Sequence, residues 1–193
     1  MAPLARPFYE REATLVARDL LGCRLVHHLN GIRLAGIITE TEAYQGEADL
    51  GCHARAGRTP RTAVMYGPAG HAYIYFTYGM HWCLNAVTLP EGSPAAVLIR
   101  AIRPVEGLEA MAANRPRLAG TPHWTDGPAK LTQALALDGR HNGADLVDGD
   151  LLSVEAGEPV RDGDVIAGPR IGLFSVPEPW KSIPWNFKLS QAA

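Results

Sequence analysis

The dipeptide Asn30-Gly31 separates two runs of strand-forming residues, 23–29 and 32–44. A two-residue hairpin turn needs positive φ at both positions, and Asn-Gly meets that need at low steric cost, so it is a strong local signal for a β-hairpin. We therefore predict an antiparallel pair of strands whose second member carries residues 39–44 near its far end. His27 and His28, close to the turn, are expected to lie at the surface.

The segment 39–44 holds two carboxylates and a tyrosine. Side chains alternate between faces along a strand, so Glu40, Glu42 and Tyr44 should point to the same side. Burying an unpaired carboxylate is expensive, which favours a fixed task for a carboxylate at the end of a buried strand. The plainer interpretation is that Glu40 and Glu42 are edge-strand charges that keep the sheet soluble. Local sequence leaves both interpretations open.

Apolar periodicity predicts the remaining elements. Helices are expected over 11–21, 104–114 and 126–135. Gly22 is the expected stop of the first helix, Pro104 belongs to the first turn of the second, and Asp126 is the expected cap of the third. Strands are expected over 71–78, 80–89, 95–102, 150–155 and 165–173, a long loop over 45–70, and an irregular tail over 176–189. The order helix, strands, helices, strands indicates an α+β fold.

Composition is that of an ordinary globular protein. Apolar residues make up 47% and charged residues 20% of 193, enough for one domain with a sizeable core, which we predict to span residues 1–193. Cys23, Cys52 and Cys83 lie far apart and include no CxxC pair, a usage typical of a reduced protein. Neither a secretory signal nor a run as long as a membrane span is evident, so we expect a cytoplasmic protein without a membrane partner.

The groups available for chemistry are few. No P-loop, GxGxxG turn or GxSxG elbow is present, and the histidines lack metal-ligand spacing, so we predict no metal site. Arg100 is embedded in the apolar run 95–102 and needs an acidic partner, for which Glu42 is the obvious candidate. A carboxylate that activates water, an arginine that orients it, and aromatic faces that hold a flat ring suit hydrolysis at a nucleobase.

Two features point to a nucleic-acid partner. The segment 53–61 carries Arg55, Arg58 and Arg61 and no acid, and such a patch can bind phosphate although the net charge is −2. Tyr78 precedes Gly79 at an expected hairpin tip, where a large aromatic has little core to enter and can contact a partner. A solvated loop and a partly buried tyrosine are the plainer alternatives.

In order and spacing, the chain resembles the alkyladenine (3-methyladenine) DNA glycosylase family from about Leu15 to Gly172. The segments that carry the resemblance are Glu40-Thr41-Glu42-Ala43-Tyr44, His53-Ala54-Arg55, Thr59-Pro60-Arg61, Tyr75, Tyr78-Gly79-Met80, Asn85, Leu98-Ile99-Arg100 and Gly127-Pro128-Ala129-Lys130-Leu131. The resemblance implies a monomeric, cofactor-free, monofunctional glycosylase with a curved antiparallel β-sheet and peripheral helices. It implies double-stranded DNA with a damaged purine as partner, with 3-methyladenine, 7-methylguanine, hypoxanthine and ethenoadenine among the substrates, and action at the nucleoid.

The resemblance also implies roles for individual residues. Glu42 corresponds to the general base that deprotonates the attacking water, and Arg100 to the arginine that helps hold that water. Tyr78, with Met80 beside it, corresponds to the element inserted where the flipped base was. Residues implied to line or adjoin the base pocket are Tyr44, His53, Tyr75, Asn85 as gatekeeper towards the guanine 2-amino group, Leu98, and Leu173 through its backbone carbonyl. Residues implied to contact the DNA backbone are Arg55, Arg58, Arg61 and Lys130.

The chain departs from the family pattern at His81, in the loop between Gly57 and Thr59, and in the tail segment 184–187. Two other functions remain open at this level. A protein that binds damaged DNA without cleaving it would have no use for a carboxylate and an arginine poised on water. A hydrolase of free nucleosides would leave Tyr78 and the arginine loop without a partner.

Overall fold

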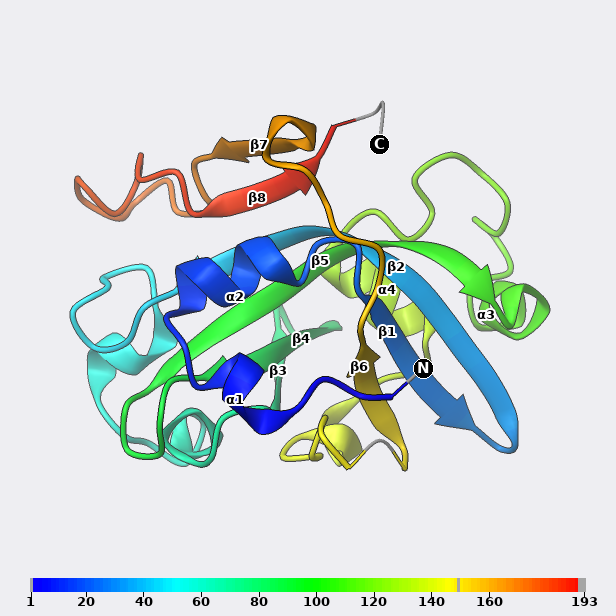
Figure 1. The fold of residues 1–193 in the computed structure, drawn as a ribbon, viewed down its shortest axis with the longest axis horizontal. Coiled ribbons are helices and arrows are strands. Elements are labelled where there is room, and N and C mark those ends of the chain that lie inside the picture. Colours follow the sequence, from blue (N-terminus) through cyan, green and yellow to red (C-terminus); the bar gives the residue numbers. More distant parts are fainter. Residues whose placement is uncertain (1, 149, 191–193) are drawn as a thin grey trace.

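The Asn30-Gly31 hairpin is the centre of the sheet in the computed structural model, which describes residues 2–148 and 150–190 (Figure 1). β1 (Arg24–Leu29) and β2 (Ile32–Tyr44) pair antiparallel from Arg24↔Ile37 to Leu29↔Ile32. Asn30 and Gly31 have φ of 50° and 80°, as this turn requires. The predicted hairpin is confirmed.

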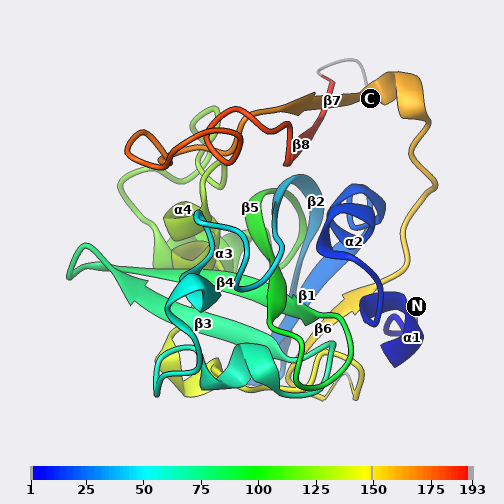
Figure 2. The ribbon, with the colours of Figure 1, turned by 90° about the vertical axis from the view of Figure 1, so that its left-hand side faces the viewer.

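Eight strands of the described residues form one sheet, in which every pairing between named strands is antiparallel. The order along the sheet is β3-β4-β5-β2-β1-β6, and β8 pairs with both β2 and β7. The further strands are β3 (Ala72–Thr77), β4 (His81–Thr88), β5 (Ala95–Glu106), β6 (Leu152–Glu155), β7 (Val165–Gly168) and β8 (Asn186–Leu189). The sheet curls strongly, as Figure 2 shows. The expected α+β fold with a curved antiparallel sheet is confirmed.

Short helices lie around the sheet. They are α1 (Arg6–Tyr9), α2 (Ala13–Asp19), α3 (Leu108–Asn114) and α4 (Pro128–Ala134), with 3-10 turns η1 (His53–Ala56), η2 (Ala63–Tyr66), η3 (Gly139–His141) and η4 (Asp162–Asp164). In Figure 1, α2 lies in front of the sheet and α4 behind it. The helices bury apolar side chains against the sheet, with Val16 and Leu20 at α2 and Leu131 and Leu135 at α4 among the fully buried residues.

Three predicted element boundaries are wrong. Pro104 belongs to β5, opposite Gly36 of β2, and α3 begins only after Gly107, whose φ of 70° turns the chain. Asp126 does not cap α4: the residue before this helix is Gly127, and the Asp126 carboxylate contacts His123. The predicted strand 165–173 ends at Gly168.

The C-terminal tail and His27 also differ from expectation. Residues 186–189 of the expected irregular tail form β8, which pairs with β2 and shields its outer edge. His27 is buried, with its Nδ1 2.7 Å from the carbonyl oxygen of Leu135, because α4 covers this part of β1. A contact with a distant segment therefore outweighs proximity to the turn.

Two bulges break the pairing of β2 with β5 next to the carboxylates. Ile38 lies opposite Ile102 and Glu40 opposite Ala101, so Thr39 is an extra residue on β2. The next pair is Thr41 with Ile99, so Arg100 is the extra residue on β5. Bulges redirect side chains and increase local twist. This irregularity places Arg100 beside both Glu40 and Glu42.

Candidate active site

Glu40 and Glu42 form a buried polar cluster with Arg100 and Asn186. Glu42 is fully buried, and Glu40 is only 6% exposed. Arg100 donates from Nε to Glu40 at 2.8 Å and from one terminal nitrogen to Glu42 Oε2 at 3.3 Å. The predicted partnership of Arg100 with Glu42 is therefore present and includes Glu40. The interpretation of both carboxylates as exposed edge-strand charges is wrong.

Glu42 accepts four hydrogen bonds, two on each oxygen. Oε1 accepts from the backbone N–H of Ile171 at 2.6 Å and from Nδ2 of Asn186 at 3.1 Å. Oε2 accepts from the hydroxyl of Tyr44 at 2.8 Å and from Arg100 at 3.3 Å. A carboxylate has about four lone-pair sites, so all of them are in use. The contact to Arg100 is the longest of the four.

The electrostatics of this cluster keep the donors protonated. Burial alone would lower the pKa of Arg100, but the charges of Glu42 and Glu40 outweigh burial and raise it above that of a free arginine. Burial and the neighbouring Glu42 carboxylate raise the pKa of Tyr44 well above the usual value for tyrosine. Both side chains are therefore donors to Glu42 throughout the physiological pH range.

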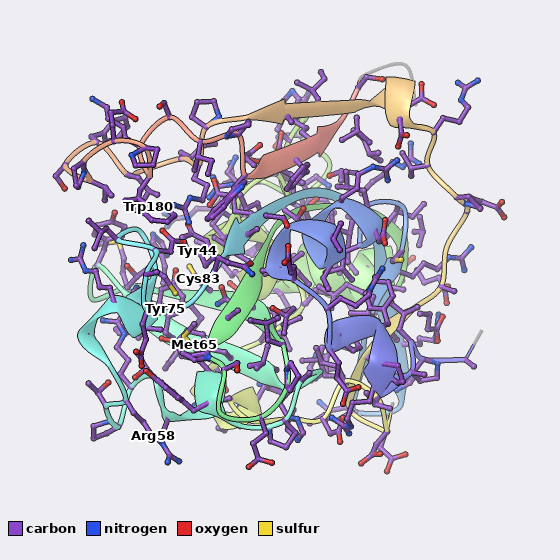
Figure 3. All side chains as sticks on the ribbon, turned by 60° about the vertical axis from the view of Figure 1, so that its left-hand side comes forward. Tyr44, Arg58, Met65, Tyr75, Cys83 and Trp180 are labelled. Atoms are coloured by element: carbon purple, nitrogen blue, oxygen red, sulfur yellow. The ribbon has the colours of Figure 1, made fainter. Side chains whose placement is uncertain are left out.

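A cavity of about 190 Å³ lies directly in front of this cluster. Its walls come from β2, η1, η2, β3, β4, β5 and the segment after β7, and they are Tyr44, Gly51, Cys52, His53, Met65, Tyr73, Tyr75, Thr77, Tyr78, Asn85, Ala96, Ile171, Gly172 and Leu173. Figure 3 shows the labelled Tyr44, Tyr75 and Met65 on the same side of the molecule. Glu42 is not itself in the lining. Tyr44 and Ile171 are, and both donate to Glu42, so the carboxylate lies one residue behind the cavity wall.

Aromatic rings dominate one part of the cavity. The rings of His53 and Tyr75 meet edge to face with centroids 4.5 Å apart, and Nδ1 of His53 lies 3.0 Å from the hydroxyl oxygen of Tyr73. Burial, with help from the charges of Arg61 and Arg55, lowers the pKa of His53 to about 4. His53 is therefore neutral at pH 7, and it places no positive charge in the cavity.

Only some of the other residues expected in the base pocket line the cavity. Asn85 lines the cavity and donates from Nδ2 to the carbonyl of Tyr73 at 2.9 Å, which fixes the orientation of its amide. Leu173 also lines the cavity. Leu98 does not: it is buried within β5, in register with Asn85 on one side and Glu42 on the other. Leu98 thus packs beneath the site instead of bordering it.

The tip of the β3–β4 hairpin projects from the body of the molecule (Figure 2). Tyr78 is 86% exposed and Met80 66% exposed. Tyr78 and Gly79 have φ of 52° and 67°, and the N–H of Met80 donates to the carbonyl of Thr77. Positive φ is rare for a bulky residue, so the backbone at Tyr78 is strained. Strain of this kind is concentrated at functional sites.

The basic residues expected to contact DNA are spread over two regions. Arg55, Arg58 and Arg61 are exposed in and after η1. The guanidinium of Arg61 lies 5.2 Å from the ring centroid of Tyr75, and that of Arg58 lies 5.9 Å from the ring of Tyr66. Lys130 lies on α4 and donates to the carbonyl of His123. Arg61 therefore contacts a residue of the cavity lining, whereas Arg58 and Lys130 contact residues outside it.

Several residues of the site were not predicted. The backbone N–H of Ile171 and the side chain of Asn186 reach Glu42 from 129 and 144 positions further along the chain. Arg170 reaches Asp49 from 121 positions further along. Tyr73 links His53 to Asn85. The alternation of Trp185, Asn186 and Phe187 was the one local signal, because it has the period of a strand.

The arrangement can hold a planar ring between aromatic and amide side chains, with a carboxylate behind the wall. Within residues 2–148 and 150–190, no three His, Cys, Asp or Glu side chains gather where they could share a metal ion. No helix of those same residues has the length and apolar character to cross a membrane. The absence of a metal and of a cofactor stays a prediction.

Comparison with known proteins defines the class. The family model described as methylpurine-DNA glycosylase matches residues 7–193. A protein of Carboxydothermus hydrogenoformans is 47% identical over 96% of this chain and 94% of its own length, and one of Myxococcus xanthus is 51% identical over 88% and 81%. One of Methanocella arvoryzae is 47% identical over 97% and 92%. All three carry the name "Putative 3-methyladenine DNA glycosylase".

The chain belongs to the methylpurine-DNA glycosylase family. It is a DNA N-glycosylase, an enzyme of DNA repair that acts on methylated purines. The predicted resemblance is confirmed. The two alternative functions are therefore wrong. This chain is neither a protein that binds damaged DNA without cleaving it nor a hydrolase of free nucleosides.

Proposed function

We propose that this enzyme removes 3-methyladenine, 7-methylguanine, hypoxanthine and ethenoadenine from double-stranded DNA by hydrolysis of the N-glycosidic bond. It acts as a monomer and as a monofunctional glycosylase, and its product is an abasic site. Because its substrate is genomic DNA, we place its action in the cytoplasm, at the nucleoid. The observation that carries the proposal is the fully buried Glu42, held by four donors directly behind an aromatic cavity.

Glu42 is the general base in this proposal, and Arg100 orients the water. All four lone-pair sites of Glu42 are occupied, so water must replace one donor, and the longest contact is that of Arg100 at 3.3 Å. Water bound there accepts from Arg100 and donates to Oε2. Its oxygen bonds to C1′ of the sugar as the bond from C1′ to the purine nitrogen breaks. Glu42 takes the proton, and the purine leaves with the bonding electrons.

The net charge of the cluster supports this step. Departure of a purine gives the sugar the character of an oxocarbenium ion, and a nearby negative charge stabilises it. Glu40 and Glu42 together carry two negative charges against the single positive charge of Arg100. The surplus negative charge lies just behind Tyr44, where the developing cation would be.

The cavity suits a purine turned out of the helix. The rings in its lining are those of Tyr44, His53, Tyr73, Tyr75 and Tyr78, and stacking on aromatic side chains is worth roughly 1–3 kcal/mol per base. The neutral His53 does not repel a purine that carries the positive charge of alkylation. The exposed Tyr78 enters the duplex where the base was.

One further observation on the cavity lining supports monofunctional action. Lysine is absent from that lining, so it offers no amine that could attack C1′ and form the Schiff base of a bifunctional enzyme. The immediate product is then an intact strand with an abasic site.

The test is incubation of the purified protein with duplexes that each contain one lesion or none. Gels run with and without hot alkali show where strands break. We expect breakage at hypoxanthine, ethenoadenine and 7-methylguanine only after alkali, and release of free 3-methyladenine from methylated DNA. Activity is expected to survive EDTA.

Breakage without alkali would contradict monofunctional action. Loss of activity in EDTA that zinc or magnesium restores would contradict the cofactor-free mechanism. Absence of breakage at every lesion would contradict the proposed substrate range.

A further inference from the structure

The segment 170–189, here called the C-terminal strap, runs from the end of β7 to the end of β8 (Figure 1, orange to red). It contributes Ile171, Gly172 and Leu173 to the cavity wall. Its last four residues form β8, where Asn186 is in register with Glu42. The strap therefore meets the site twice, once at each of its ends.

A buried ion pair anchors the first end. Arg170 and Asp49 are both fully buried in their side chains, and Nη2 of Arg170 lies 2.8 Å from Oδ1 of Asp49. The guanidinium also lies 4.7 Å from the ring centroid of Tyr44 and 5.1 Å from that of Trp185. A charge pair held between two rings fixes the next residue, Ile171, whose N–H donates to Glu42.

Asn186 defines the second end. Its Nδ2 lies 2.8 Å from Oε1 of Glu40 and 3.1 Å from Oε1 of Glu42, and the residue is only 8% exposed. One amide nitrogen therefore bridges the two carboxylates from the side opposite Arg100. Like charges this close repel each other strongly in a dry interior, so both need donors that hold them in place.

The group that bridges the two carboxylates is the side-chain amide of Asn186, which carries no charge. A cation at this position would cancel the surplus negative charge of the cluster and weaken Glu42 as a base. An amide supplies two N–H donors and leaves the charge unchanged. Glu42 is thereby oriented without losing its negative field towards the cavity.

We propose that Asn186 is a positioning residue for the glycosylase reaction: it bridges Glu40 and Glu42, holds both carboxylates in place, and aims Glu42 at the water. This inference rests on the proposed function of Glu42 as general base. It assigns a role in the reaction to a strand that was expected to be irregular.

The experiment measures single-turnover excision of hypoxanthine from duplex DNA over a range of pH. The Asn186→Leu variant has similar volume without donors, Asn186→Asp has the same shape with a third negative charge, and Asn186→Gln keeps the amide. Ser190→Ala, just beyond β8, is the matched control. Binding to a duplex with an uncleavable abasic analogue and thermal unfolding are measured for each variant.

We expect Asn186→Leu to slow excision about 10- to 100-fold at neutral pH, the usual cost of losing a hydrogen bond to a charged group. A hydrogen bond to the charged form favours that form, so its loss moves the acid limb of the rate–pH profile to higher pH. The Asn186→Asp variant should move this limb further, and Asn186→Gln should recover part of the rate. Binding and the Ser190→Ala profile should match the parent.

The proposal would be overturned if the acid limb of the rate–pH profile stays where it is in the parent for both Asn186→Leu and Asn186→Asp. This holds even if lower stability reduces the rates of these variants. If Asn186→Leu does not fold, Asn186→Asp and Asn186→Gln decide by the same criterion. Measurements on the parent and on the Glu42→Gln variant distinguish a failure of the Asn186 proposal from a failure of the proposed function. An active parent and an inactive Glu42→Gln with unmoved Asn186 variants overturn only the role of Asn186. An active Glu42→Gln overturns the role of Glu42.

Discussion

The hydroxyl of Tyr44 donates to Oε2 of Glu42 at 2.8 Å, while the same residue lines the cavity. In the proposed mechanism, this one side chain would contact both a purine in the cavity and the base that activates water. Its pKa is raised well above the usual value, by burial first and then by Glu42, so it remains a donor. If the cavity binds the purine as proposed, contact with the purine and orientation of the Glu42 carboxylate are coupled through this residue.

The Tyr44→Phe variant separates these two effects, because it keeps the ring and removes the donor. We expect single-turnover excision to fall by at least about 10-fold, since a hydrogen bond to a charged group contributes roughly 1.5–3 kcal/mol. Binding to lesion DNA should stay close to that of the parent. If binding falls and the rate of the bound complex does not, Tyr44 acts through stacking alone.

The Tyr78→Ser variant tests insertion into the duplex. Flipping a base costs a few kcal/mol, and an aromatic that fills the gap recovers part of that cost. We expect the largest loss of hypoxanthine excision in a matched duplex, a smaller loss in a mismatch, and little loss in a single strand. Ile32→Ser, an exposed apolar change beside the other hairpin turn, is the matched control. Equal losses on all three substrates would mean that Tyr78 supports the fold or the cavity.

The Asn85→Ser variant tests discrimination against guanine. Asn85 lines the cavity with its amide fixed by the carbonyl of Tyr73, so a guanine 2-amino group would meet a side chain that cannot turn freely. A smaller residue should raise excision of guanine and 7-methylguanine relative to hypoxanthine. The ratio of the single-turnover rates measures this effect, and an unchanged ratio would remove Asn85 from the specificity determinants.

His53 gives a prediction about pH and stability. Burial, Arg61 and Arg55 lower its pKa to about 4 in the folded protein, below the ordinary value of 6.5. Between these values the unfolded chain binds a proton that the folded chain does not, so the free energy of unfolding falls as pH falls from 6.5 to 4. Urea unfolding across this range measures the slope. The His53→Gln variant should have a shallower slope, and an identical slope would contradict the lowered pKa.

The sequence correctly predicted those features whose physical cause lies in residues that are neighbours along the chain. Asn30-Gly31 predicted the central hairpin because both turn residues need positive φ, and the break at Gly79 between two strand-like runs located the exposed tip at Tyr78. The need of an embedded Arg100 for an acidic partner correctly indicated Glu42. These inferences required no knowledge of distant contacts.

The parts that were missed depend on contacts between distant segments. His27 is buried because α4 covers β1, and the tail becomes a strand because the edge of β2 accepts it. Asn186 and Arg170 reach the site only through that pairing and through the buried Asp49. Pro104 stays extended because β2 continues opposite it, which outweighs its preference for a helix start.

The most direct test of the account is excision by the Glu42→Gln variant under single-turnover conditions, since Gln keeps the shape and removes the base. A positioned general base contributes roughly 10²–10⁴-fold, so the rate should fall by at least that much while binding to lesion DNA persists. A Glu42→Gln variant that excises hypoxanthine nearly as fast as the parent would contradict the assignment of Glu42 as the base.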